Sequence, residues 1–286
     1  TTREAYLDDL RSLINELINK IPSSITVPTL STSELNKLSQ KFNFELPEDE
    51  KLCEILTIPF YLSDYLNIIN NKNLLYKDFQ SLLWQKQIMK DEYRRNNLHL
   101  RREQAFLELI KQKSTTNSFY INIHSADNEA LEALCNDEII KYDNNQYGYF
   151  ITHDIYEEWG LEKFIDKSYK LNDSNLEAFL NTIGNSLPIR RSFRNWLSDK
   201  LYDNASNIQT LISAILPNNK IENFWKDEIV VSIMLSSYAH KFFEEYKSLL
   251  LQNNQELLLR VIFMLRIACK TIDYNLLKTL AINKKE

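Results

Sequence analysis

A histidine and an aspartate, His153 and Asp154, stand together where a short apolar run gives way to an amphipathic segment, in the sequence GYFITHDIYEEWGLEKF (148–164). An imidazole N–H can donate a charge-assisted hydrogen bond to a phosphate group, and a carboxylate beside it can orient the ring. The structural alternative is that Thr152 or Asp154 caps the helix that follows and that the histidine is incidental. The pair therefore predicts either an anion contact or a helix cap.

The glycine positions exclude a phosphate-binding loop within the given sequence. Three glycines are present, Gly148, Gly160 and Gly184, so neither G-x-x-x-x-G-K-[ST] nor G-x-G-x-x-G can be written with them. We expect no catalytic residue in this chain by itself. We also expect the chain to be part of a longer protein.

Composition and charge narrow the class of protein further. Of the 286 residues, 44% are hydrophobic, which is enough for buried cores in one large or several small domains. The 34 basic and 39 acidic residues give a formal net charge of -5 without a long basic block, which disfavours a dedicated DNA-binding protein. The three cysteines are far apart and lack metal-ligand spacing, so we expect reduced thiols and no metal site.

The hydrophobic pattern also bears on location. No apolar run approaches the roughly 18 residues of a membrane span, and the opening residues, TTREAYLDDL, lack the features of a signal peptide. We therefore expect a soluble, cytoplasmic protein without membrane contact.

The first hundred residues predict helices separated by clear breaks. Leucine and isoleucine recur at three- and four-residue spacing over 4–20, which indicates an amphipathic helix, and the β-branched segment 25–30 is typical of a strand. A hydroxyl at Ser31 and an acid at Glu34 favour a helix start there. Further helices are expected over 51–69, broken at Pro59 because proline lacks an N–H, and over 76–90.

Residues 100–165 change pattern. A helix is followed by the alternating segment SFYINI (118–123), by a helix over 127–137 and by two short runs flanking Asn144, Asn145 and Gln146, a favourable hairpin turn. The order helix, strand, helix, hairpin is that of a winged helix. From 174 onward the pattern is helical, and its Asn-rich breaks indicate stacked antiparallel helix pairs.

Four segments, TTREAYLDDL, ITVPTLSTSEL, ILTIPFYLSDYL and YGYFITHDIYEEW, follow one another in an order that resembles the back half of a STAND-type P-loop NTPase, the class that includes NACHT and NB-ARC proteins. In that class a Thr-Thr-Arg strand end supplies a sensor arginine, a lid proline packs beside the adenine, and a His-Asp pair reaches the phosphates. The resemblance implies that Arg3, Pro59 and His153 contact the nucleotide. The sequence departs from the pattern at Thr57, where glycine is expected, and at Thr152, where methionine is expected.

The resemblance implies a mainly α chain with four parts: an NTPase-core remnant (1–30), a helical lid (31–98), a winged-helix domain (99–170) and a helical-repeat (HEAT-like) segment (171–286). The Walker A and Walker B segments are not in the given sequence, so the intact parent, and not this portion, would be the ATPase and would bind ADP or ATP with Mg²⁺. We expect no cofactor for this portion alone.

The function implied is that of a nucleotide-dependent molecular switch, in signalling or defence. Its helical region would relay to protein partners or a sensor domain, and the parent would self-oligomerise. Two alternatives stay open: a helical protein-interaction scaffold with a structural winged helix, and a winged-helix transcription regulator.

Charged residues bear on these alternatives. The helix over 127–137, in the recognition-helix position, has four acidic residues and no lysine or arginine, so we expect no nucleic-acid binding through it. Arg94–Arg95 and Arg101–Arg102 flank a helix and are expected to form a solvated face. A second basic group, expected to bind an anion or acidic partner only as a minor alternative, consists of Arg190, Arg191 and Arg194.

Overall fold

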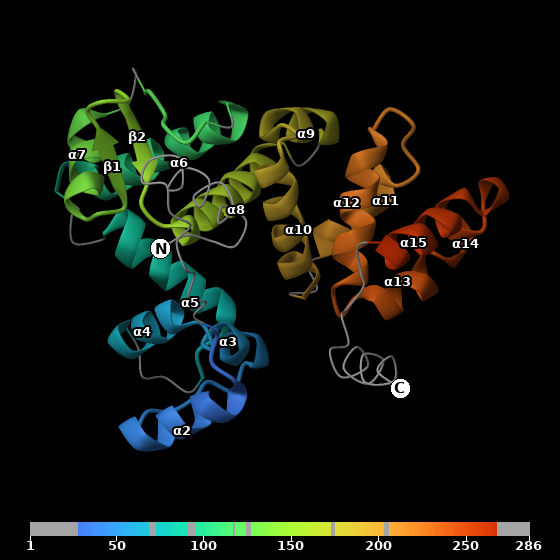
Figure 1. Ribbon diagram of the computed structural model, residues 1–286. Helices are drawn as coiled ribbons and strands as arrows, with labels where there is room; N and C mark the ends of the chain where they lie inside the picture. Colours follow the sequence, from blue (N-terminus) through green and yellow to red (C-terminus); the bar gives the residue numbers. More distant parts are fainter. Residues whose placement is uncertain are drawn as a thin grey trace, which may run out of the picture. The chain divides into compact units, whose positions relative to one another are not determined.

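The computed structural model describes residues 28–68, 73–90, 95–116, 118–123, 127–172, 175–202 and 206–267. The chain divides into two compact units, 1–83 and 84–286, which are described separately. Helices dominate the described residues of both units, as the sequence predicts (Figure 1). The helix expected over 4–20 and most of the strand expected over 25–30 lie outside the described residues, and the four predicted domain boundaries stay predictions.

The first unit contains α2 (Thr32–Phe42), α3 (Glu50–Ile55), α4 (Pro59–Ile68) and α5 (Tyr76–Leu83). The expected start of α2 is confirmed as a capping box: the Glu34 N–H donates to Ser31 Oγ at 3.3 Å, and the Ser31 N–H donates to Glu34 Oε2 at 2.7 Å. The expected break at Pro59 is also confirmed, because α3 ends at Ile55 and α4 begins with the proline itself.

One aspartate links two helices of this unit. Asp49 caps α3 by accepting from the Leu52 N–H at 2.8 Å, and its other oxygen accepts from the Tyr76 N–H at the start of α5 at 3.2 Å. Aromatic residues fill the core between the helices: Tyr65 and Phe79 are fully buried, with ring centroids 6.1 Å apart.

The second unit opens with η2 (Trp84–Met89), a π-helix, so the single helix expected over 76–90 is instead two helices of different type. After η4 (Arg95–Asn97) come α6 (Leu98–Thr116), α7 (Asn128–Asn136), β1 (Ile140–Asp143), β2 (Gly148–Ile151) and α8 (Asp154–Leu171). The expected hairpin is confirmed: β1 and β2 are antiparallel, with Ile140 opposite Ile151. Its turn is held by Asp143, which accepts from the N–H groups of Asn145 and Gln146.

The strand expected over 118–123 is reduced to one bridge, in which Ile121 and Tyr149 exchange two 2.8 Å backbone hydrogen bonds. Ser118 Oγ donates to the Tyr120 carbonyl at 2.7 Å, a local bond that competes with a ladder. The close approach favours Gly148, since a Cβ there would lie 3.1 Å from Tyr120 Cβ, a tight contact. The elements thus follow the expected order, with the first strand almost lost.

Helices continue through the rest of the described chain. The α10 helix packs on α8 and on α12, and α12 packs on α15, giving a row of neighbouring helices (Figure 1). All four tryptophans are buried and contribute to the packing between helices. The helices of this region are α9 (Leu176–Ile183), α10 (Leu187–Tyr202), α11 (Ser206–Ile215), α12 (Asn223–Met234), α13 (Ala239–Glu245), α14 (Lys247–Leu250), η5 (Asn253–Gln255) and α15 (Glu256–Ile267).

Candidate functional site

The three residues predicted to contact a nucleotide lie in different parts of the chain. Arg3 is outside the described residues. Pro59 is exposed as the first residue of α4, in the first unit, and His153 is exposed immediately before α8, in the second unit. Each of the latter two is therefore described in its own unit.

His153 occupies the N-cap position of α8 in an extended conformation, with φ -132° and ψ 132°, and its side chain makes no capping hydrogen bond. Its ring meets Tyr156 edge-on, with centroids 5.7 Å apart. The possibility that Thr152 caps the helix is wrong, because Thr152 Oγ1 donates to the carbonyls of Glu138 and Ile139 and so holds the hairpin. The imidazole thus stands at a helix N-terminus and reaches solvent.

The start of α8 combines an imidazole with the positive end of a helix, an arrangement that favours anions. Two acidic residues, Asp154 and Glu157, occupy the first turn and oppose an anion. Lys113 Nζ lies 3.6 Å from Glu157 Oε2, so the lysine partly offsets the negative charge of that glutamate. The start of α8 thus presents one imidazole together with the acidic side chains of Asp154 and Glu157.

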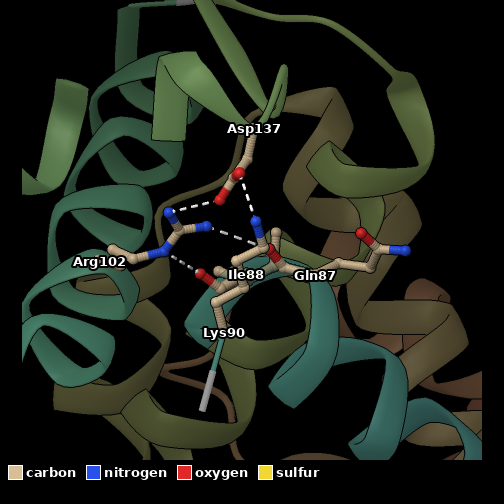
Figure 2. Close-up of polar contacts among 5 residues, drawn as sticks. All are labelled: Gln87, Ile88, Lys90, Arg102 and Asp137. Atoms are coloured by element: carbon tan, nitrogen blue, oxygen red, sulfur yellow. Dashed lines mark hydrogen bonds and ion pairs between the residues drawn. The ribbon is translucent and has the colours of Figure 1, made fainter. Parts of the chain in front are cut away.

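A second polar cluster surrounds Arg102, whose side chain is fully buried. Figure 2 shows its guanidinium pointing toward the end of η2 and toward Asp137, the residue that follows α7. Nε donates to the Ile88 carbonyl at 2.8 Å, and Nη2 donates to the Gln87 carbonyl at 3.2 Å. Nη1 forms an ion pair with Asp137 Oδ2 at 2.7 Å, and Lys90 Nζ contacts the other carboxylate oxygen at 2.5 Å.

The solvated face expected for Arg101–Arg102 is wrong for Arg102. The arginine lies three and four residues before Ala105 and Phe106, and seven before Leu109, all of which are buried. That spacing puts it on the core face of α6. The helical spacing from apolar residues was visible in the sequence, but the charge of Arg102 led to the expectation that its side chain is exposed.

The neighbouring Arg101 engages the acidic helix. Its Nη2 lies 2.7 Å from Asp127 Oδ1, and its Nη1 lies 2.7 Å from Glu129 Oε2. The hydrogen bond from Arg101 lowers the pKa of Asp127, which also caps α7. The α7 helix carries no basic residue of its own, and this cation is already paired with its carboxylates. The geometry is therefore poorly suited to contacting a nucleic-acid backbone.

The second basic group is engaged within its own unit. Arg190 lies over the Phe224 ring, 4.2 Å from its centroid. Arg191 pairs with Glu158 at 3.2 Å, and Arg194 pairs with Glu228 at 2.9 Å. These contacts join α10 to α8 and α12, so this group serves packing and gives no support to the anion-binding alternative.

Among the described residues, no three histidine, cysteine, aspartate or glutamate side chains come together in a way that would hold a metal ion. No helix in the described part of the chain has both the length and the apolar character needed to cross a bilayer. A scan against known protein families finds no matching family, and a search of curated proteins finds no significant relative.

Proposed function

We propose that this chain is the regulatory portion of a STAND-type nucleotide-dependent switch. Its lid and winged helix would close over ADP or ATP in the intact parent, and its helical region would relay the nucleotide state to partners or a sensor domain, in signalling or defence. The observation that carries the proposal is the exposed imidazole of His153 at the N-terminus of α8, directly after the β1–β2 hairpin. This is the position at which the resemblance puts a phosphate contact.

The chemistry of such a contact is simple. A histidine N–H and the first amides of a helix both favour a phosphate oxygen. The nucleotide would thereby hold the winged helix in a closed state, and losing the contact would favour the open state by the difference in binding free energy. Pro59, exposed at the start of α4, would offer rigid apolar surface to the base.

The test is calorimetric ADP titration of the intact parent carrying His153→Ala. A charge-assisted hydrogen bond contributes about 1.5–3 kcal/mol, so ADP affinity should fall by roughly 10- to 100-fold. His240→Ala is the matched control, because His240 is also exposed but lies on α13. Affinity within about twofold of the parent for His153→Ala would reject the nucleotide contact.

The scaffold alternative is favoured by one observation. The α15 helix exposes Leu259, Ile262 and Phe263 at 60%, 46% and 57%, on one face. If the chain is a scaffold, a protein partner bound to this face should co-purify with it. Leu259→Ser together with Phe263→Ser should abolish that co-purification, whereas His153→Ala should leave it intact. Leu235→Ser is the control, since Leu235 is 60% exposed outside α15.

A further inference from the structure

The π-helix η2 begins at the sequence boundary between the units. A π-helix bonds each N–H to the carbonyl five residues earlier, and such segments are rare and concentrate at functional sites. The common alternative is the α-helical register, with bonds to the fourth residue. The π form therefore needs side chains that favour it.

Arg102 supplies that preference at the end of η2. The chain leaves the helix at Lys90, whose φ is 51°, so the carbonyls of Gln87 and Ile88 need donors from elsewhere. The guanidinium donates to both, while Asp137 holds the guanidinium and Lys90 together (Figure 2). The three side chains come from α6, the end of α7 and the end of η2.

The start of η2 is fixed to the same helix. Trp84 Nε1 donates to Glu103 Oε1 at 2.8 Å, and its ring lies 6.0 Å from that of Phe106. Ile88 is fully buried between these two attachments. A change of register would move Trp84 off Glu103, because one residue of an α-helix corresponds to a rotation of about 100°.

We propose that residues 84–89 are a two-register switch, held in the π-helical form by the Arg102–Asp137 pair. Loosening this pair lets the segment adopt the α-helical register. That change turns residues 84–89 about the axis of the segment, relative to α6 of the same unit. The device is a property of this chain's own contacts and does not depend on nucleotide binding.

The test uses Asp137→Asn in this chain labelled with 5-fluorotryptophan, with the Trp84 ¹⁹F resonance assigned by Trp84→Phe. We expect a second Trp84 resonance and unchanged resonances for Trp159, Trp196 and Trp225. Amide exchange over 84–90 should stay within about fivefold of the original, because the α-helical register is still hydrogen bonded. Asp127→Asn is the matched control, since it also removes an α6–α7 ion pair, and its partners Arg101 and Ala130 lie outside η2.

Two results would overturn the switch. A single, unshifted Trp84 resonance in folded Asp137→Asn would mean that the pair does not select the register. A second resonance accompanied by exchange more than about tenfold faster over 84–90 would indicate fraying of the segment. Lys90→Gln, a milder change at the same carboxylate, decides the matter if Asp137→Asn does not fold: it should show the second resonance at lower population, and its absence would reject the proposal.

Discussion

At the scale of single side chains, Arg102 is a fully buried charged residue of the second unit. A fully buried guanidinium loses its hydration, which costs several kcal/mol unless the charge is paired and its N–H groups are used. Here one carboxylate and two carbonyl oxygens surround it. Its neighbour Arg101 is 32% exposed and pays much less for its ion pairs. Adjacent arginines of one helix thus differ in energetic role because of the face on which each lies.

We predict that Arg102→Met lowers the free energy of unfolding by about 3–5 kcal/mol, because it removes the donor to two buried carbonyls and leaves Asp137 with Lys90 as its cationic partner. Urea denaturation measures the change. Arg101→Met, the matched control, should cost much less, since water screens its ion pairs. Equal losses for the two variants would contradict the assignment of Arg102 as the buried anchor.

Asp166 of α8 contacts Trp196 and Lys200 of α10, and we expect these contacts to weaken in acid. Burial alone would raise its pKa, but hydrogen bonds from Lys170, Lys200 and Trp196 outweigh burial and lower the pKa to about 2. A carboxyl whose folded pKa is depressed adds stability above its unfolded pKa, near 4, and loses it as the pH falls toward 2. We expect Asp166→Asn to lower the free energy of unfolding by about 1–2 kcal/mol at neutral pH. Between pH 4 and pH 2, the stability of the variant should depend less on pH than that of the original chain. Thermal unfolding across that range measures it, and an unchanged pH profile in the variant would be inconsistent with this role.

Close helix packing is the main feature at the scale of elements. The α6 and α8 helices approach each other at Gly160, where an added Cβ would lie 2.5 Å from Ile110 Cγ1 and 3.1 Å from Phe106 Cε1. Both neighbours are almost fully buried, so neither can move into open space. A glycine inside a helix costs about 1 kcal/mol relative to alanine, and here the approach of the two helices offsets that cost.

We predict that Gly160→Ala destabilises the chain by about 1–3 kcal/mol, in spite of the better helix propensity of alanine, because the core is overpacked. In an Ile110→Ala background, which removes the clashing atoms, the same substitution should cost less than about 0.5 kcal/mol. A double-mutant cycle by urea denaturation gives both values. Equal costs in the two backgrounds would show that Ile110 is not the obstacle.

For the whole molecule, charge balance is the property that matters most for binding. The net charge is -5, and the described arginines of α6 and α10 are engaged in contacts within the second unit. The α7 helix presents carboxylates where a winged helix would present cations. These features argue against the transcription-regulator alternative.

We therefore predict that the chain binds duplex DNA more weakly than about 10⁻⁴ M at physiological salt, measured by fluorescence anisotropy. A variant with Glu129→Lys and Glu132→Lys should bind more tightly, with affinity that falls as salt rises. Micromolar, salt-dependent binding by the unaltered chain would instead favour the transcription-regulator alternative.

The sequence by itself determined the features that depend on neighbouring residues. The capping box of Ser31 and Glu34, the break at Pro59 and the β1–β2 turn all use bonds or steric limits within a few residues, so local chemistry was sufficient to predict them. The exposed His153 beside a helix start belongs to the same group, although its proposed partner lies outside the structure.

The tertiary structure alone decided the features that depend on residues far apart in the chain. We infer that Arg102 and Asp137 set the π-helical form of 84–89. Only the bridge from Ile121 to Tyr149 remains of the strand expected over 118–123. The spacing of Arg102 from Phe106 indicated in part that Arg102 lies on the core face of α6. Its charge can be buried only because the fold brings the carboxylate of Asp137 to it. Long-range pairing of this kind has no local pattern, since the energy that supports it exists only after the helices have packed.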